Sequence, residues 1–333
     1  MIYILTHTDL DGVGAAAAYL LVRNLKITDA SVAFVEPYNL GETLKQYTEY
    51  LEPRDTVAIM DLGQPGREWN HLLSVIQKIT RKGINVEWYD HHVWDKEDIE
   101  KLRDLGVNVA IDRTTCAAGV VSRYSRKIYG EPNGKLAKYL EELESSICAA
   151  DLWRWNHPLA PKLFRVVSLH GAKGDARRRL VLGKLVSLRL WDDELEEILI
   201  DYVDAELSNY GRITKHTIKV EADNCVIAGV VKPYGPPSNS FIGAYLLARF
   251  NADIAVIIRE NGAISLRSRT IDVQRIAKRL GGGGHPKAAG AKIELGLLDR
   301  LFKRILPKRF TARVLGIVLR EALSMGLCKQ SSL

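Results

Sequence analysis

Two short strings of acidic residues and histidines, far apart in the sequence, carry the clearest chemical signal in this chain. The first is His7-Thr8-Asp9-Leu10-Asp11-Gly12 and the second is Asp90-His91-His92. Each follows an apolar run of the kind that forms a strand, Met1 to Thr6 and Ile84 to Tyr89. Side chains at the carboxyl ends of strands in an open α/β sheet lie where ligands bind. Because carboxylates and imidazoles are ligands of manganese-like ions, we interpret the strings as one two-metal hydrolytic site.

Three residues of the first string, and one position beyond it, could bind metal. His7, Asp9 and Asp11 alternate along an extended strand end, so their side chains point the same way. The alternative is a polar turn in which an Asp caps the following helix. Asp61 ends the apolar run Thr56–Met60 and could equally cap a helix or form a turn. On a neighbouring parallel strand it would be the carboxylate that bridges two cations.

The second string has little value for packing. One imidazole, His91, can bind metal while His92 reaches a phosphate oxygen, and Asp90 can orient a ring from behind. Asp151 ends the apolar helical stretch 147–150, where an unpaired buried charge is unfavourable. A metal partner explains this carboxylate, and a salt bridge at the helix end is the alternative. Trp153 and Trp155 follow directly and could stack a base or simply belong to the core.

The elements that position these residues alternate between strand and helix in the first half of the chain. This pattern predicts βαβ units and a mainly parallel sheet with flanking helices. The expected strands are 32–35, 56–60, 86–89 and 107–111, and the expected helices are 12–25 and 67–81. Residues 115–210 look helical throughout. We expect an α/β protein of two domains, 1–210 and 211–333, with the active site in the cleft between them.

The second expected domain is a smaller mixed α/β unit. Its predicted elements are a hairpin at 218–231, a helix to about Phe250, strands at 253–259 and 263–267, and a basic helix at 297–327. Residues 212–333 hold 21 Lys and Arg against 8 Asp and Glu, whereas the whole chain carries +7. The N-terminal part is therefore acidic. A metal-loaded catalytic domain beside a domain that binds a polyanion would have this asymmetry, although basic surface also serves solubility.

Composition excludes several classes of protein. The chain has 333 residues, of which 47% are hydrophobic and 26% charged, enough for two cores. No apolar run reaches the roughly 18–20 residues of a membrane span, and the first residues read as a strand rather than a signal peptide. The cysteines, Cys116, Cys148, Cys225 and Cys328, show no CxxC spacing, so we expect neither a disulfide scaffold nor a zinc site. A cytoplasmic location is the default.

A glycine-rich string in the C-terminal half is suited to phosphate. The segment is Gly281-Gly282-Gly283-Gly284-His285, and Ser265-Leu266-Arg267-Ser268-Arg269 precedes it. Four glycines allow backbone N–H groups to converge on an anion to which His285 also donates. Arg267 and Arg269 occupy alternate strand positions and supply fork-shaped donors. A flexible loop between helix and strand is the alternative.

Taken together, HxDxDG, the strand-ending Asp61, DHH and the helical Asp151 resemble, in order, the four motifs of the DHH phosphoesterase superfamily. The GGGGH segment looks like the substrate-binding motif of the DHH-associated C-terminal domain of RecJ-type nucleases, nanoRNases and cyclic-dinucleotide phosphodiesterases. In several branches the first histidine lies four residues before the first Asp, where this chain has Leu5. The resemblance implies these ligands for two ions: His7, Asp9 and Asp61 for one, and Asp11, Asp61, His91 and Asp151 for the other.

The resemblance also implies that His92 contacts the scissile phosphate. Arg113-Thr114-Thr115 lies at a strand-to-helix junction and could hold substrate through its hydroxyls and the helix N-terminus. Gly282, Gly283, Gly284, His285, Arg267, Ser268 and Arg269 would complete the substrate site.

The expected function is a metal-dependent phosphodiesterase, an exonuclease or oligonucleotide-degrading nuclease with two Mn²⁺ ions, or Mg²⁺ in their place. Its partners would be single-stranded DNA or RNA, short oligonucleotides or dinucleotides, without a membrane, and a homodimer or a replication or repair partner is compatible with the sequence. The alternatives are a cyclic or linear dinucleotide phosphodiesterase (c-di-AMP or pApA type), a pyrophosphatase, which the GGGGH segment disfavours, and a non-catalytic replication scaffold. Such scaffolds typically lose the aspartates that this chain retains.

Overall fold

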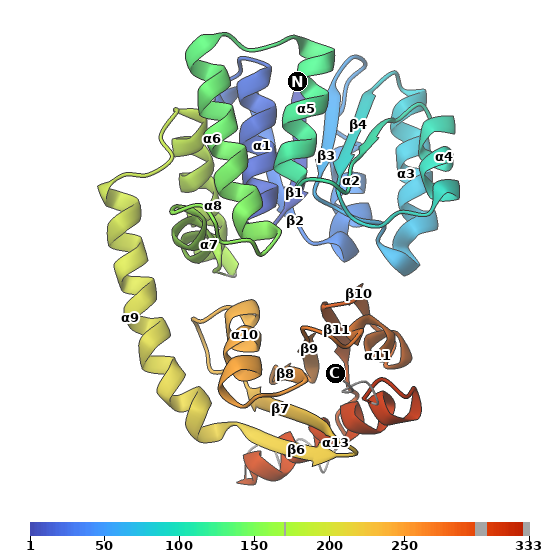
Figure 1. Cartoon of the computed structure of the whole chain (residues 1–333). Coiled ribbons are helices and arrows are strands. Elements are labelled where there is room, and N and C mark those ends of the chain that lie inside the picture. Colours follow the sequence, from blue (N-terminus) through green and yellow to red (C-terminus); the bar gives the residue numbers. More distant parts are fainter. Residues whose placement is uncertain (170, 297–304, 329–333) are drawn as a thin grey trace. The chain divides into compact units, whose positions relative to one another are not determined.

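The computed structural model describes residues 1–169, 171–296 and 305–328, and the chain forms two compact units, Met1–Ile200 and Asp201–Leu333 (Figure 1). Each unit is α/β, as expected, and each is described by itself. The division falls inside the long helix α9 (Asp193–His216), so the boundary expected at 210/211 remains a prediction. Among the described residues, no helix is long and apolar enough to cross a membrane.

The first unit is built on a five-stranded sheet in which all paired strands are parallel, which confirms the prediction for this half of the chain. The order across the sheet is β2-β1-β3-β4-β5. The strands are β1 (Ile2–His7), β2 (Ala30–Val35), β3 (Thr56–Met60), β4 (Asn85–Asp90) and β5 (Asn108–Ile111). The order reverses between β1 and β3, and this switch point is where open α/β sheets bind ligands.

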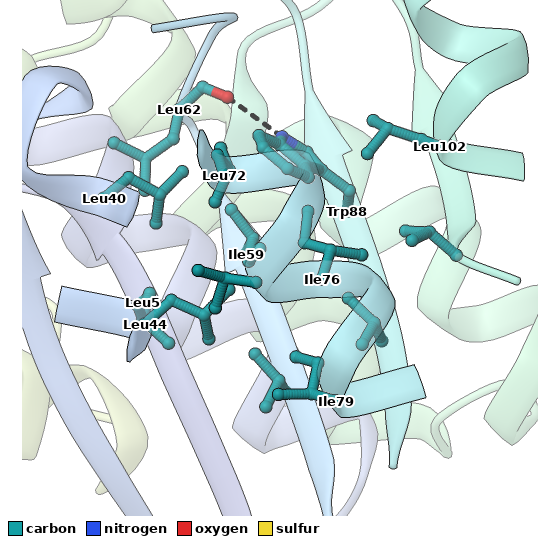
Figure 2. Packing of buried hydrophobic residues seen from close by; sticks show 14 of the residues in the cluster. Leu5, Leu40, Leu44, Ile59, Leu62, Leu72, Ile76, Ile79, Trp88 and Leu102 are labelled. Atoms are coloured by element: carbon teal, nitrogen blue, oxygen red, sulfur yellow. Dashed lines mark hydrogen bonds between the residues drawn. The ribbon is translucent and has the colours of Figure 1, made fainter. Parts of the chain in front are cut away.

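One face of this sheet packs against three helices, α2 (Leu40–Tyr47), α3 (Trp69–Arg81) and α4 (Lys96–Asp104). Figure 2 shows the resulting core, in which alternate strand residues such as Ile59 and Trp88 meet the apolar stripe of α3. The indole of Trp88 also donates a hydrogen bond of 2.9 Å to the carbonyl of Leu62. The core therefore fixes the chain just beyond the end of β3.

The other helices of the first unit surround α1 (Leu10–Val22), which is buried along its whole length. Its run of four alanines, 15–18, lets neighbouring helices approach closely. Those helices are α5 (Ala117–Tyr129), α6 (Gly134–Asp151), α7 (Ala160–Val167) and α8 (Gly171–Val186). Short 3₁₀ turns lie at Ile27–Asp29, Pro37–Asn39 and Gly66–Glu68. The helical character predicted for residues 115–210 is confirmed.

The second unit contains a mixed six-stranded sheet of order β10-β11-β9-β8-β7-β6, with only β7 and β8 parallel among the described pairs. Its strands are β6 (Ile218–Ala222), β7 (Cys225–Val231), β8 (Ile254–Ile258), β9 (Ala263–Arg267), β10 (Gly283–His285) and β11 (Ala288–Lys292). The helix α10 (Asn239–Arg249) packs on one face, and α11 (Val273–Arg279) and α13 (Pro307–Ser324) pack on the other. Part of the helix expected at 297–327 lies outside the described residues.

The cysteines overturn one expectation. Cys116 pairs with Cys148, and Cys225 pairs with Cys328, so all four form disulfides. The partners lie 32 and 103 residues apart in the sequence, and the fold rather than the local spacing brings them together. Disulfides are rare in most cytosolic proteins, so the cytoplasmic location remains a prediction.

Candidate metal centre

The register of the first sheet brings the ends of three strands level. Thr6 of β1 pairs with Met60 of β3, and Met60 pairs in turn with Tyr89 of β4. The residues that follow, His7, Asp61 and Asp90, therefore reach the same edge. Asp61 has a φ of 55°, which is uncommon for a residue other than glycine. Its N–H still bonds to the Tyr89 carbonyl at 2.9 Å, so the strand pairing holds this turn in place.

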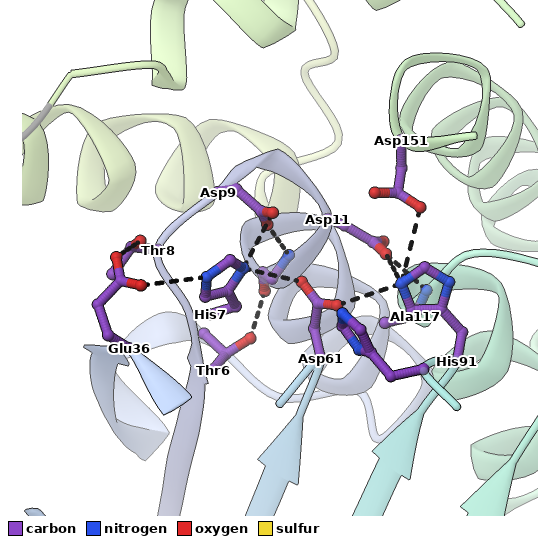
Figure 3. Close-up of polar contacts among 12 residues, drawn as sticks. Thr6, His7, Thr8, Asp9, Asp11, Glu36, Asp61, His91, Ala117 and Asp151 are labelled. Carbon is purple, nitrogen blue, oxygen red and sulfur yellow. Dashed lines mark hydrogen bonds and ion pairs between the residues drawn. The ribbon is translucent and has the colours of Figure 1, made fainter. Parts of the chain in front are cut away.

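His7, Asp9 and Asp61 form the first group of candidate metal ligands (Figure 3). His7 Nδ1 lies 2.9 Å from Asp9 Oδ2 and 3.6 Å from Asp61 Oδ2. The other oxygen of Asp9 accepts the N–H of Gly12 at 3.1 Å and caps α1. The helix-cap interpretation and the ligand interpretation of Asp9 are thus compatible, because each uses a different oxygen.

Glu36 is a residue that the sequence reasoning missed. It directly follows β2, just as His7 ends β1, and its Oε2 lies 3.5 Å from His7 Nε2. Its Oε1 accepts the hydroxyl of Thr8 at 2.7 Å. Bonding to His7 lowers the pKa of Glu36 to about 2, so this carboxylate is ionised. A carboxylate behind one ring nitrogen orients the other nitrogen toward a metal.

The buried Arg178 of α8 was also missed. Its Nε donates to the carbonyl of Thr8, and its Nη2 donates to the carbonyl of Leu169 at 2.6 Å. Only 3% of the side chain is exposed. This arginine therefore fixes the loop between His7 and Asp9 from an element more than 160 residues away in the sequence.

The second group contains Asp11, His91 and Asp151 and also borders Asp61. His91 Nε2 lies 3.5 Å from Asp61 Oδ1, 3.7 Å from Asp11 Oδ2 and 3.7 Å from Asp151 Oδ2. Figure 3 shows Asp61 between His7 and His91. Since one oxygen of Asp61 faces His7 and the other faces His91, this carboxylate belongs to both groups.

The first turn of α5 holds Asp11 in place. The backbone N–H groups of Ala117 and Ala118 donate to its two oxygens at 2.6 and 2.9 Å. The free N–H groups at a helix N-terminus stabilise an anion in this way. Cys116, which precedes these alanines, is linked to Cys148 of α6, three residues before Asp151. The disulfide thus connects the elements that position two of the candidate ligands.

Asp90, from the second string, is hydrogen-bonded to both His92 and Trp94 beside the candidate ligands. His92 Nδ1 lies 2.7 Å from Asp90 Oδ1, and the indole of Trp94 donates to Asp90 Oδ2 at 2.6 Å. Burial alone would lower the pKa of His92, but Asp90 raises it above its usual value. Asp90 therefore orients the ring of His92 and stabilises its protonated form relative to an isolated histidine. The ring centroids of His91 and His92 are 4.7 Å apart, and His92 also forms a possible ligand group with Asp61 and His91.

The electrostatics of the site fit divalent cations. Asp61 Oδ2 and Asp151 Oδ2 are buried and accept no hydrogen bond. Burial, together with Asp61 and Asp151, raises the pKa of Asp11 well above its usual range, and burial raises that of Asp151 to about 7. Burial would lower the pKa of His91, yet Asp61 and Asp11 raise it to about 10. Clustered carboxylates that retain protons, with orphaned buried oxygens, are a donor set for Mn²⁺-like ions.

The segment 113–115 is divided by the fold. Arg113 and Thr114 are exposed, and the N–H and hydroxyl of Thr114 both donate to Asp112 Oδ1, at 2.9 and 2.6 Å. Thr115 is buried, with its hydroxyl 3.4 Å from Cys148 Sγ. Arg113 and Thr114 thus remain candidates for contact with substrate, whereas Thr115 packs beneath α5.

In the second unit, the segment 267–269 likewise contains both packed and exposed side chains. The Arg267 side chain lies over Gly243 of α10, where a Cβ would approach its Cγ to 2.5 Å, and it donates to Ser240 Oγ at 3.2 Å. Burial lowers its pKa to about 10. The hydroxyl of Ser268 is buried and accepts the N–H of Ile271 at 2.9 Å, so it shapes the loop. Arg269 is exposed.

The glycine string is a hairpin rather than a loop that wraps an anion. β10 pairs antiparallel with β11, and Gly284, with φ of 130°, lies so close to Ala289 that a Cβ would approach its Cα to 2.6 Å. The N–H of Gly282 bonds to Ala277 and that of Gly281 to Lys278, closing the end of α11. The N–H groups of Gly281 and Gly282 are therefore already used within the fold, and a role of the string in phosphate binding remains a prediction. Residues 283–285, including His285, are exposed.

Comparison with known families agrees with this arrangement. Residues 1–147 match the DHH family, N-terminal domain, and residues 236–307 match the DHHA1 domain. The chain belongs to the DHH phosphoesterase superfamily. The oligoribonuclease NrnB of Bacillus subtilis (strain 168) is 26% identical to this DHH protein over 313 residues, a match covering 88% of this chain and 73% of NrnB. Membership and this similarity support a nuclease or phosphodiesterase.

Solved structures share the fold of this DHH protein. The pGpG-specific phosphodiesterase PggH from Vibrio cholerae has a TM-score of 0.55 at 14% identity, covering 95% of this chain and 99% of PggH. RecJ from Thermus thermophilus, solved in complex with Mn²⁺, has a TM-score of 0.57 at 18% identity. The match covers 96% of this chain but 52% of RecJ, so the DHH protein spans about half of that nuclease.

Proposed function

We propose that this DHH protein is a two-metal phosphodiesterase that degrades short single-stranded nucleic acid from an end. The position of Asp61, with one oxygen 3.6 Å from His7 and the other 3.5 Å from His91, carries this proposal. A shared carboxylate of this kind suits two cations held about 3.5–4 Å apart. The similarity to an oligoribonuclease favours RNA oligonucleotides as the substrate.

The two ligand groups would hold Mn²⁺, or Mg²⁺ in its place. The proposed ligands are His7, Asp9 and Asp61 for one ion, and Asp11, Asp61, His91 and Asp151 for the other. When bound, such ions activate water and stabilise the charge on a phosphodiester in hydrolysis.

The remaining residues of the site have separate tasks in this proposal. Glu36 and Arg178 keep His7 and the following loop in place. Asp90 orients the ring of His92, and the other ring nitrogen of His92 donates a hydrogen bond to a phosphate oxygen. Arg113 and Thr114, together with His285 and Arg269 of the second unit, are proposed to bind the substrate, because each is exposed.

A length series on end-labelled oligonucleotides tests this function. Metal-free protein would be supplied with Mn²⁺ and with RNA or DNA of two to about twenty nucleotides, labelled at either end. We expect Mn²⁺-dependent release of mononucleotides from one end, with RNA of a few nucleotides turned over fastest. Full activity in EDTA would contradict the metal-dependent reaction. Cleavage restricted to dinucleotides would support the dinucleotide phosphodiesterase, and cleavage of pyrophosphate alone would contradict nuclease function.

A further inference from the structure

The turn that follows Asp151 has an unusual backbone. Trp153 and Trp155 have φ values of 58° and 54°. Bulky residues rarely adopt this left-handed conformation, which is unfavourable without glycine. Residues held in such conformations concentrate at functional sites, where the surrounding structure maintains them. Two of them directly after a candidate metal ligand require an explanation beyond chain reversal, which glycine would achieve with less strain.

The turn is fixed to the end of α6. The N–H of Trp153 bonds to the Ala150 carbonyl at 3.1 Å, and those of Arg154 and Trp155 both bond to the Ala149 carbonyl at 2.9 Å. These acceptors lie one and two residues before Asp151. The hydrogen bonds therefore fix the backbone that carries both indoles relative to Asp151.

The aromatic rings form a supported but partly exposed cluster. The Trp153 side chain is 44% exposed. Its ring centroid lies 4.7 Å from that of Trp155 at an interplanar angle of 72°, and Trp155 lies 5.6 Å from Phe164 of α7. Trp153 also lies 6.4 Å from Phe164, so the three rings support one another. Trp155 and Phe164 are half-buried, whereas the large ring of Trp153 remains exposed on a left-handed backbone.

Arg154 lies between the two tryptophans and is also exposed. Its guanidinium makes no ion pair with any residue that the structure describes. Aromatic rings that alternate with a cation, on a rigid support, are typical of surfaces that bind single-stranded nucleic acid, where bases stack and phosphates meet positive charge.

We propose that Trp153 is a stacking platform for the nucleobase next to the phosphate held at the metal centre, and that Arg154 binds an adjacent phosphate. The nature of the ligand rests on the proposed function, whereas the platform itself rests on the geometry of the turn. Because every base has a π-face, the platform would read the presence of a base and not its identity. It would thus favour nucleotides over other phosphodiesters.

Paired substitutions and paired substrates test the platform. Trp153→Gly removes the ring and relieves the backbone, since glycine adopts a positive φ readily. Trp153→Phe keeps an aromatic face. Leu188→Gly is the matched control, because Leu188 has a φ of 59°, is 49% exposed and lies beyond α8 in the same unit. Each variant would be assayed on an RNA trinucleotide and on the same trinucleotide with an abasic residue at each position in turn.

Stacking of one base is worth a factor of roughly 5 to 150 in affinity. We therefore expect Trp153→Gly to raise the KM for the intact trinucleotide by about tenfold or more, while the KM for one of the abasic substrates stays near the wild-type value. The melting temperature of this variant should stay unchanged or rise. The KM of Trp153→Phe for the intact trinucleotide should remain within a few-fold of the wild-type value. Leu188→Gly should leave the KM unchanged for the intact and the abasic substrates.

Two outcomes would overturn the platform: an unchanged KM in Trp153→Gly, or an equal rise for the intact substrate and all abasic substrates. A second measurement does not depend on catalysis. With Mg²⁺ present and a non-hydrolysable trinucleotide analogue, the intact ligand should quench the tryptophan fluorescence of wild-type protein more than that of Trp153→Phe, and the abasic analogue should lose this difference. Absence of the difference contradicts the platform. Failure of the wild-type protein to hydrolyse any oligonucleotide would instead contradict the proposed function.

Discussion

The signature motifs of the two units differ in burial and in the contacts that support them. In the first unit, the acidic residues and histidines of the site are buried or half-buried, and residues distant in the sequence support them, as Glu36 does for His7. In the second unit, the glycine string forms an exposed hairpin whose first two N–H groups are already used by the end of α11. Contacts between distant segments thus assemble the first motif into a candidate site. The second motif is a hairpin that exposes individual side chains such as His285.

This difference indicates where binding energy should reside. A buried set of carboxylates with orphaned oxygens and raised pKa values gains stability when a cation enters. An exposed hairpin has little to gain beyond the contacts of His285 and its neighbours. Substitutions of the candidate ligands and their supports in the first unit should therefore change metal binding and turnover, and substitutions of exposed side chains in the glycine string should change substrate affinity.

The largest effect is expected at Asp61. Asp61→Ala removes the carboxylate shared by both groups, and turnover should fall by about 10³-fold or more, because metal ions contribute several kcal/mol of charge stabilisation. Asp55→Asn is the matched control: Asp55 is also buried and precedes the other end of β3, where it pairs with the N-terminus. Turnover of purified, folded variants measures the difference. If both variants lose activity equally, the loss reflects stability and not the site.

The pH dependence of metal affinity should be the next largest effect. The pKa of His91 is raised to about 10 and that of Asp151 to about 7, so both groups hold protons that a metal ion must displace. Affinity for Mn²⁺ should therefore rise with pH between pH 6 and 8, by up to about tenfold per pH unit for each proton released. Titration calorimetry at several pH values measures this. An affinity independent of pH would contradict the proposed protonation of the metal-free site.

A smaller loss of metal affinity is expected for Glu36→Gln. The amide keeps the size of the side chain but removes the charge behind His7 Nε2, and loss of such supporting carboxylates lowers metal affinity by about 10- to 100-fold. Glu42→Gln on the exposed face of α2 is the control. Metal content after dialysis against limiting Mn²⁺ distinguishes the two. An unchanged metal content in Glu36→Gln would remove the support for His7 as a ligand.

The smallest effect is expected in the second unit. His285→Ala should raise the KM for oligonucleotides by about tenfold, the effect of losing one charged or polar donor to a phosphate, while metal content stays normal. Arg267→Ala should in addition lower thermal stability, since the Arg267 side chain is packed against Gly243. A changed metal content in His285→Ala would contradict the expectation that the glycine string affects substrate affinity and not metal binding.

The sequence predicted those features that depend on local pattern. Apolar runs identified the strands, and an acid or histidine after each run indicated the candidate ligand groups that the structure brings together, because parallel strands end at one edge. Glu36 follows β2 in the same way and could have been found by the same signal. The helix-cap and ligand interpretations of Asp9 appeared exclusive, yet they are compatible, because Oδ1 caps α1 while Oδ2 faces His7.

The remaining features depend on contacts between distant segments. Ala117 and Ala118 bind Asp11 through backbone N–H groups, which no side-chain pattern reveals. The disulfide partners lie 32 and 103 residues apart, and their pairing follows from the packing of whole elements. The run of glycines suggested an anion-binding loop, because glycine is conformationally free. The close approach of Gly284 to Ala289 on the neighbouring strand, which leaves no room for a Cβ, cannot be read from the sequence.

The number of ions bound per chain tests the central claim most directly. Metal-free protein titrated with Mn²⁺ in a calorimeter, with ion content checked by elemental analysis, should bind two ions, and Asp61→Ala should lose high-affinity binding at both groups because each includes that carboxylate. Binding of a single ion, or two ions retained in Asp61→Ala, would contradict a metal centre built around Asp61.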